Sequence, residues 1–408
     1  MDSSQAPPNT MRPLKNWIGS KTPDSRNRPF AVILKSADRC NYSCHYCYVE
    51  EHCAVPVMPI STAKAAIERV LSYVGPHRKV NLIWHGGEPL LTGQRFYAQM
   101  LEICRQFPEN VIEHCIQTNG ALLTDEFVQF CASNRILISL SLDGPESITD
   151  AHRRTAAGDG TFCRTMRAFE MLRSHGMVLG CVCVLHQGNV NRIEELYDFF
   201  ALHGINVRIN PVVKSGRAAD GYNLLSISPA EYGKAMCRLF DLWFDDKYRI
   251  QVDPLFTILG NLVSPTVWGC DYQGRCLESI IAINPDGSVF PCGRFAGMSD
   301  FRLGNIVEDS DLTALFSREP FLKLNSRGPE TVEGCADCEF VQICNAGCMV
   351  TAYMSRHNCG DRDYYCEGRQ MLFRHMTTRL KHHLESIKEE SEYDTGTETD
   401  QRTWSQSA

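Results

Sequence analysis

The sequence lacks the features that would direct it to a membrane or to nucleic acid. It has no apolar run near the roughly 18 residues needed to cross a bilayer, and its start, MDSSQAPPNTMRPLKNWIGS, lacks the apolar core of a signal peptide. The chain has 41 Lys and Arg against 48 Asp and Glu, a net charge of −7 and no basic block. Nucleic acid is therefore a poor partner. We expect a cytoplasmic protein with neither a membrane nor a nucleic-acid partner.

Cysteine, by contrast, is abundant, with 20 residues in a chain of 408. In a reducing cytoplasm, clustered thiols are metal ligands or catalytic groups more often than disulfides. Three lie within eight residues, in the stretch CNYSCHYC: Cys40, Cys44 and Cys47. A 4Fe–4S cluster needs four outer ligands, so three thiols leave one metal position open, as a catalytic centre requires. The alternative is a closed zinc site completed by His45, His52 or Cys53.

Short apolar runs alternate with segments of helical periodicity through the first half of the chain. The expected strands are residues 30–34, 80–84, 113–117, 136–142, 177–185 and 205–213. The expected helices between them are residues 61–74, 93–106, 124–133, 161–175 and 191–203. This alternation predicts a parallel sheet with right-handed crossovers. An open doubly wound sheet and a partial barrel both fit the pattern.

Polar loops follow the first four expected strands. The cysteine triplet follows the first strand, and HGGEP (85–89), TNG (118–120) and DGP (143–145) follow the next three. In a barrel, such loops meet on one face, which carries the active site. Gly, Asn and Asp also favour ordinary turns, but four such loops together favour a functional face.

The pattern changes from about residue 228. Ser228-Pro229 predicts the start of a helix that runs to about residue 246. Nine cysteines lie between residues 270 and 366, a composition typical of a small domain held together by metal. Eight of them would fill two four-ligand sites: Cys270, Cys276, Cys292, Cys335, Cys338, Cys344, Cys348 and Cys366. Spacing alone does not separate iron–sulfur clusters from zinc here.

The remaining nine thiols lie outside these sets. Seven fall inside expected strands or helices and are interpreted as small buried hydrophobic residues: Cys104, Cys115, Cys131, Cys163, Cys181, Cys183 and Cys237. Cys53 and Cys359 have no such explanation.

The triplet, the GGEP sequence and the eight-cysteine pattern with Gly287-x₄-Cys292 together resemble the radical S-adenosylmethionine (SAM) superfamily with a C-terminal SPASM extension. The likeness covers about residues 30–370 and is strongest to anaerobic sulfatase-maturating enzymes and to maturases of ribosomally made peptides (RiPPs). It implies an α/β fold: a partial (β/α)6 barrel of the TIM type, followed by a cysteine-rich SPASM domain with two auxiliary iron–sulfur clusters. The expected parts are a flexible arm, the radical SAM core, the SPASM domain and a disordered acidic tail, over residues 1–28, 29–250, 251–385 and 386–408.

The resemblance also implies three 4Fe–4S clusters and a SAM site. Cys40, Cys44 and Cys47 would hold the cluster whose fourth iron binds the amino and carboxylate groups of SAM. One auxiliary cluster would be held by Cys270, Cys276, Cys292 and Cys348, and the other by Cys335, Cys338, Cys344 and Cys366. The positions that match SAM contacts are Tyr46, Gly86, Gly87, Glu88, Ser141 and Arg153.

These SAM positions also make chemical sense as residue types. Glycines let the backbone approach a ligand closely, and a hydroxyl at Ser141 can meet a ribose. Glu88 suits an ammonium group, and Arg153 can bind a carboxylate at two points. The alternative for Arg153 and Arg154 is a solvated basic pair.

One position departs from the sulfatase-maturating pattern. Those enzymes carry a general-base Asp directly after the Cys that matches Cys292, where this chain has Gly293, which cannot accept a proton. The catalytic base is therefore unknown, and we expect a peptide maturase. SAM would be cleaved reductively to a 5′-deoxyadenosyl radical that takes hydrogen from a peptide residue, giving a crosslink, a thioether or an oxidised side chain. The alternative is a sulfatase-maturating enzyme that forms formylglycine from Cys or Ser.

The expected partners are a peptide or protein substrate and an external reductant such as flavodoxin or ferredoxin. About 28 residues precede the first strand, too few for the leader-binding module of peptide maturases. The substrate would then be recognised by the SPASM region, by barrel loops or by a separate leader-binding protein. A zinc-stabilised scaffold and a simple electron carrier are the alternatives from other functional classes.

Overall fold

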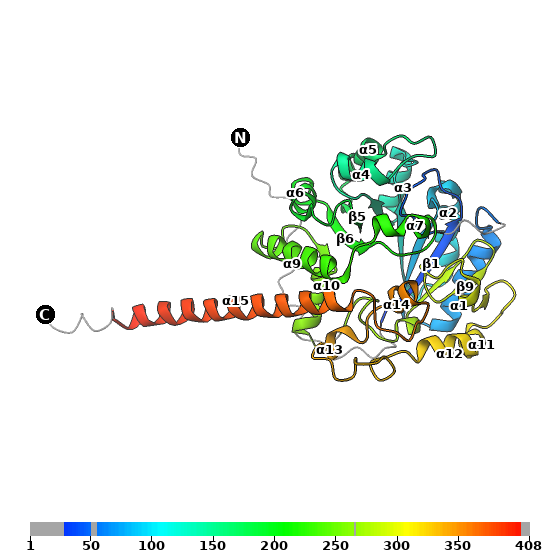
Figure 1. The fold of residues 1–408 in the computed structure, drawn as a ribbon. Coiled ribbons are helices and arrows are strands. Elements are labelled where there is room, and N and C mark those ends of the chain that lie inside the picture. The colour runs from blue at the N-terminus through cyan, green and yellow to red at the C-terminus, as the bar shows by residue number, and fades with distance from the viewer. Residues whose placement is uncertain (1–27, 50–54, 265–266, 401–408) are drawn as a thin grey trace.

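The computed structural model describes residues 28–49, 55–264 and 267–400, and these form a sheet surrounded by helices (Figure 1). The strands are β1 (Phe30–Ala37), β2 (Lys79–Gly86), β3 (Val111–Thr118), β4 (Leu137–Ser141), β5 (Gly180–Leu185), β6 (Asn206–Pro211), β7 (Val252–Asp253), β8 (Ile280–Ile283), β9 (Ser288–Phe290) and β10 (Gly304–Asn305). Their order in the sheet is β10-β9-β8-β1-β2-β3-β4-β5-β6-β7. The six expected strands are thus all present.

The order of the strands decides between the two expected architectures. Strands β1 to β6 are parallel and lie in sequence order, whereas a doubly wound sheet reverses its order at a switch point. The doubly wound alternative is therefore wrong, and the partial barrel is confirmed. Strand β8 pairs in parallel with the other edge of β1. The cysteine-rich part of the chain thus continues the barrel sheet.

Helices surround the sheet, and the six that the sequence predicts are among them. They are α1 (Ile60–Val74), α2 (Gln94–Cys104), α3 (Asp125–Ser133), α4 (Glu146–His152), α5 (Phe162–Ser174), α6 (Ile193–His203), α7 (Arg217–Asp220), α8 (Tyr222–Leu225), α9 (Pro229–Asp245), α10 (Leu255–Val263), α11 (Leu312–Phe316), α12 (Glu319–Asn325), α13 (Val341–Cys344), α14 (Met349–Arg356) and α15 (Cys366–Asp400). Each crossover helix buries one apolar face, as the 3.6-residue period requires. Between β2 and α2, the buried rings of Trp84, Phe96 and Tyr97 meet edge to face. The predicted start of α9 is confirmed, with a capping box between Ser228 and Glu231.

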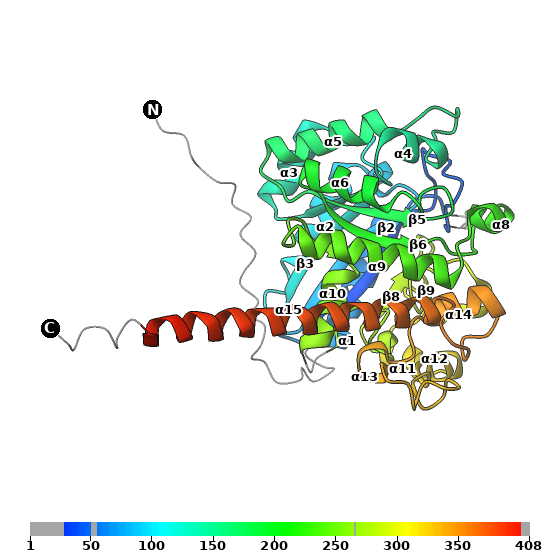
Figure 2. The same ribbon diagram turned by 60° about the vertical axis from the view of Figure 1, so that its left-hand side comes forward.

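Helix α15 corrects the expectation of a disordered tail from residue 386. It continues to Asp400 and projects away from the rest of the chain in both views (Figures 1 and 2). Its first turns cross α9 so closely that a Cβ on Gly368 would overlap the carbonyl oxygen of Pro229. Once packing has fixed these turns, each further residue adds a hydrogen bond, and Lys and Glu are good helix formers. The low apolar content of the tail from residue 386 therefore led to a wrong prediction of disorder up to Asp400.

Some expectations concern residues outside the described part of the chain. These are most of the N-terminal arm, His52, Cys53 and residues 401–408. The domain boundaries stay predictions. Among the described helices, none combines the length and the apolarity that crossing a membrane requires, and the expected cytoplasmic location also stays a prediction.

The cysteines that were interpreted as small buried hydrophobic residues are buried or partly buried, with one exception. Cys104, Cys131, Cys181 and Cys183 are buried, and Cys115 and Cys237 are partly buried. The interpretation is wrong for Cys163, which is exposed at the start of α5. Cys359 is partly buried.

Two buried histidines should make the stability of the fold depend on pH. Burial lowers the pKa of His114 and of His186 to about 4, below the value of about 6.5 for a histidine in an unfolded chain. The unfolded chain therefore takes up protons first as the pH falls, and stability present above pH 6.5 is lost toward pH 4. Between pH 7.5 and 6, each histidine should lower the free energy of unfolding by about 0.8 kcal/mol.

Chemical denaturation of the His114→Gln variant at both pH values checks this prediction. The variant should lose less stability than the parent on acidification. The matched control is His382→Gln, which changes an exposed histidine on α15 and should leave the pH dependence as it is. An unchanged slope in His114→Gln would contradict the prediction.

Candidate active site and cluster sites

The HGGEP loop after β2 lies against the segment that leads into the cysteine triplet. The Gly87 N–H donates to the Ala37 carbonyl at 2.7 Å, and the Glu88 N–H donates to the Arg39 carbonyl at 2.8 Å. A Cβ on Gly86 would overlap the Ala37 carbonyl oxygen, and one on Gly87 would overlap that of Arg39. The two glycines are thus needed for the close approach of two backbone segments. Their contact with SAM stays a prediction.

The last residue of α4 and the segment after it hold the triplet loop by backbone hydrogen bonds. The Ser43 N–H donates to the Arg154 carbonyl at 2.7 Å, and the His45 N–H donates to the His152 carbonyl at 3.0 Å. The triplet loop is therefore fixed by backbone hydrogen bonds to the loops after two other elements, β2 and α4. Cys44 is buried, and Cys40 and Cys47 are partly buried.

The Glu88 carboxylate ties the loops after β2 and β3 together. It is fully buried and accepts hydrogen bonds from the Leu90 N–H at 3.0 Å, the Thr118 hydroxyl at 2.5 Å and the Asn119 N–H at 2.9 Å. Burial raises the pKa of Glu88, and the hydrogen bonds oppose that shift. Since a carboxylate has about four acceptor positions, most of them are taken by the protein. The expected contact with an ammonium group stays a prediction.

Arg153 is buried beside the triplet, so the alternative of a solvated basic residue is wrong at this position. The residue is 7% exposed, and its Nη1 donates to the Tyr46 hydroxyl at 3.0 Å. The Tyr46 hydroxyl donates in turn to the Asp143 carboxylate, which also accepts from the Val184 N–H at 2.9 Å. Burial alone would lower the pKa of Arg153, but Tyr46, Cys44 and Asp143 raise it.

One donor of this arginine is left over. Among the described residues, nothing accepts a hydrogen bond from the buried Arg153 Nε. An unused guanidinium donor beside a three-thiol loop fits the carboxylate of SAM. Ser141, at the carboxyl end of β4, is half-buried and accepts from Gln117 Nε2 at 3.0 Å. Its contact with the ribose stays a prediction.

Sequence reasoning missed the side chains that surround Tyr46. The sequence placed Asp143 only within the polar loop DGP (143–145) on the expected functional face, with no role of its own. His186 stacks on the Tyr46 ring with centroids 5.5 Å apart, and His152 meets His186 edge to face at 4.5 Å. The available signal was their position, since Asp143 lies two residues after the end of β4 and His186 directly follows β5, where active-site residues of barrels lie.

The C-terminal cysteines separate into the two sets that the resemblance implies. Four line one cavity: Cys335, Cys338, Cys344 and Cys366. The four thiols of the other set also lie close together. Burial raises the pKa of Cys276 most, and the next largest effects that raise it are the charges of Cys270, Cys348 and Cys292. The gathering of four thiols around a cavity fits a cluster. The ligand of each individual iron stays a prediction.

The position of the missing base is closely packed. A Cβ on Gly293 would lie 3.1 Å from Ile33 Cδ1 of β1. The carboxylate of Asp271, which directly follows Cys270, does not replace the base well. Although burial opposes it, the charges of Arg369, Arg294 and Arg208 lower the pKa of Asp271 to about 2. Such a carboxylate is a weak proton acceptor near neutral pH.

A parallel partial barrel with a three-thiol loop after β1, joined to two four-thiol sets, defines the class of radical SAM enzymes with auxiliary clusters. Residues 34–200 match the model of the Radical SAM superfamily, and residues 270–339 match SPASM, an iron–sulfur cluster-binding domain. The chain belongs to the radical SAM superfamily and carries a SPASM domain.

Sequence relatives and solved structures indicate which enzymes of this class the chain resembles. The chain is 26% identical, over 378 residues, to the cysteine-type anaerobic sulfatase-maturating enzyme of Clostridium perfringens (strain 13), covering 88% of this chain and 100% of that protein. The structure of native anSMEcpe with bound AdoMet has a TM-score of 0.77 at 25% identity, covering 88% of this chain and 100% of that one. Streptococcus suis SuiB bound to the precursor peptide SuiA shares the fold, with a TM-score of 0.62 at 18% identity, covering 83% and 76%.

The protein is therefore an enzyme of the radical SAM class, and its cofactors are SAM, a 4Fe–4S cluster and auxiliary iron–sulfur clusters. The zinc scaffold and the simple electron carrier are wrong. These relatives fit the sulfatase-maturating alternative better than the peptide maturase that the missing base favoured.

Proposed function

We propose that this enzyme is of the sulfatase-maturating type and oxidises a Cys or Ser side chain of a protein substrate to formylglycine. The observation that supports this most strongly is the match to a cysteine-type sulfatase-maturating enzyme over that protein's whole length. A peptide segment as the substrate is supported by SuiB, which shares the fold and was solved with a precursor peptide.

The SAM site of this proposal lies at the carboxyl ends of β1 to β4, and its cluster ligands are Cys40, Cys44 and Cys47. When bound there and reduced by one electron, SAM supplies the radical that removes a hydrogen atom from the substrate carbon. The protein orients the cofactor through the unused Nε of Arg153. The Tyr46 hydroxyl and Asp143 hold that guanidinium in place. Burial of these groups excludes water from the radical.

Formylglycine formation removes two electrons from the substrate. From a Ser side chain this gives the aldehyde directly, whereas from a Cys side chain it gives a thioaldehyde, which water hydrolyses to the aldehyde with release of the sulfur as hydrogen sulfide. One of the two electrons leaves with the hydrogen atom, and the second needs an acceptor, which the two C-terminal cysteine sets would hold. An external flavodoxin or ferredoxin is the proposed source of the electron for SAM. The substrate proton that leaves with the second electron has no carboxylate to accept it at Gly293. Water or a group of the substrate is the proposed acceptor.

The absence of a base favours a second candidate, RiPP maturation. Chemistry that needs no carboxylate at this position, such as formation of a crosslink or a thioether in a precursor peptide, is compatible with Gly293. A separate leader-binding protein would then bring the substrate.

Incubation with a sulfatase peptide should distinguish the two candidates. We expect the anaerobically reconstituted enzyme, with SAM and a reductant, to convert the target Cys or Ser to an aldehyde that mass spectrometry detects. The control peptide carries Ala at the target position and should stay unmodified. Formation of 5′-deoxyadenosine without aldehyde, from both the Cys and the Ser peptide, would reject the sulfatase proposal in favour of RiPP maturation.

A further inference from the structure

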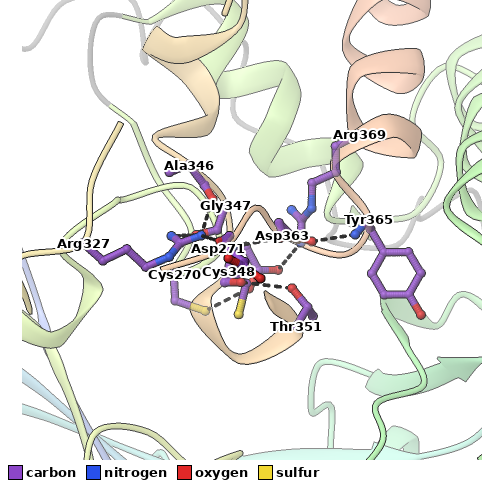
Figure 3. Close-up of polar contacts among 11 residues, drawn as sticks. Cys270, Asp271, Arg327, Ala346, Gly347, Cys348, Thr351, Asp363, Tyr365 and Arg369 are labelled. Carbon is purple, nitrogen blue, oxygen red and sulfur yellow. Dashed lines mark hydrogen bonds and ion pairs between the residues drawn. The ribbon is translucent and has the colours of Figure 1, made fainter. Parts of the chain in front are cut away.

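Arg369, near the start of α15, is a buried cation that pairs with Asp363, close to Cys270 and Cys348 (Figure 3), and it also lines the cavity of the other C-terminal cysteine set. Its residue is 3% exposed. Its Nη2 lies 3.2 Å from Asp363 Oδ2 and 3.6 Å from Asp271 Oδ2, and its guanidinium lies over the Tyr272 ring, 5.0 Å from the centroid. One nitrogen of the guanidinium thus carries both ion pairs.

The other two nitrogens of Arg369 are left without a partner. Within the described residues, neither Nε nor Nη1 finds a hydrogen-bond acceptor, although both are buried. Leaving buried donors of a charged group unpaired is costly. Arg369 also lines the cavity that Cys335, Cys338, Cys344 and Cys366 share. The unpaired donors therefore belong to a side chain that borders a cavity whose other polar lining consists of the four thiols, Arg362, Asp363 and Gln370.

The next residue supplies a donor to the same cavity. Gln370 Nε2 lies 3.7 Å from Cys338 Sγ and 3.7 Å from Cys366 Sγ. Gln370 thus presents N–H groups to two thiols of this set, and Arg369, the residue before it, borders the same cavity. The set to which Cys270 and Cys348 belong is approached differently. Asp363, which pairs with Arg369, accepts a hydrogen bond from the Cys348 N–H at 2.8 Å.

We propose that Arg369 and Gln370 donate hydrogen bonds to the sulfur atoms of the second auxiliary cluster and raise its reduction potential. The proposal rests on these four thiols holding that cluster. Reduction adds one electron, and hence one negative charge, to a cluster. A nearby cation and N–H donors stabilise the reduced form, which makes the cluster easier to reduce. Arg369 then sets how readily this cluster accepts an electron during turnover.

The test is a redox titration followed by electron paramagnetic resonance. It uses the full chain with Cys40, Cys44 and Cys47 changed to Ala, so that only auxiliary clusters contribute and about eight irons are expected. In that background, Arg369→Met should shift the midpoint potential of one cluster to more negative values by about 59 mV, a tenfold change in its ratio of reduced to oxidised form. Gln370→Met, which removes donors without changing charge, should shift the same midpoint in the same direction by less.

The matched control is Arg379→Met on the same helix. Arg379 pairs with Asp241 and Asp245 near the surface and lies about 15 Å further along the helix axis. Arg379→Met makes the same change in net charge as Arg369→Met. Because Arg379 lies far from the cysteine cavity, this variant should leave the midpoint potentials of both clusters unchanged. Equal shifts of both clusters, or the same shift in Arg379→Met, would mean a general charge effect and overturn the proposal.

Retention of the cluster is read from the iron content. If Arg369→Met lowers it to about four irons, then Arg369→Lys and Gln370→Met decide the question, and unchanged midpoints in both overturn the proposal. Fewer than eight irons in the background variant itself would overturn the premise that the second set holds a cluster. Neither outcome depends on the substrate, so the sulfatase proposal is tested separately.

Discussion

Changing Cys40, Cys44 and Cys47 together to Ala should abolish SAM cleavage and leave the C-terminal iron in place. The three thiols come from one loop, which is held by hydrogen bonds to the loops after β2 and α4. Neither C-terminal set takes a ligand from that loop, so the auxiliary clusters should assemble without it. Anaerobically reconstituted enzyme should hold about twelve irons, four in each of three clusters, and the variant about eight.

The measurements are 5′-deoxyadenosine by chromatography, and iron and acid-labile sulfide by chemical analysis. Cys163→Ala is the matched control, because it removes an exposed thiol that belongs to no set. It should keep both the iron and the cleavage of SAM. Cleavage that persists in the triple variant would show that the triplet is not the active centre. About four irons in the unchanged enzyme would remove the auxiliary clusters.

The alternation of strands and helices was predictable because each crossover carries its own local signal. Strands β1 to β6 are short runs rich in apolar residues, in most of which every second residue is buried, and each following helix has a 3.6-residue apolar period. The connection between the barrel and the cysteine-rich part was not predictable. Strand β8 has four residues, Ile280–Ile283, and pairs with β1, from which about 250 residues of sequence separate it. A short apolar run carries no information on so distant a partner.

The candidate site was predictable to a similar degree. The spacing of the cysteines predicted which of them form the candidate cluster sites. It did not predict what Gly86 and Gly87 contact, because their closest neighbours come from the segment before the triplet. The importance of Asp143 depends on Tyr46 and Val184, which reach it from two other parts of the chain. Such a residue looks like an ordinary turn former until the fold brings its partners to it.

The second large effect is expected at Arg153, where Arg153→Met should weaken SAM binding about 10- to 150-fold. A hydrogen bond between charged groups contributes about 1.5–3 kcal/mol, and each 1.4 kcal/mol is a factor of ten in affinity. The reduced triplet cluster should still form, because Arg153 holds no iron. In the variant, the electron paramagnetic resonance signal of this cluster should respond only at higher SAM concentrations than in the unchanged enzyme. Equilibrium dialysis gives the dissociation constant of SAM directly.

Tyr46→Phe separates binding by Arg153 from its positioning. This variant removes only the hydroxyl that joins the Arg153 Nη1 to Asp143, so the guanidinium and its unused Nε remain. If Arg153 binds SAM and the hydroxyl only holds it in place, Tyr46→Phe should weaken binding less than Arg153→Met does, and Arg153→Lys, which keeps the charge but loses the planar fork, should fall between them. Equal losses in all three variants would indicate that they disturb the triplet loop as a whole. Full affinity in Arg153→Met would assign the buried Nε to some other partner, and the carboxylate of SAM would need a different cation.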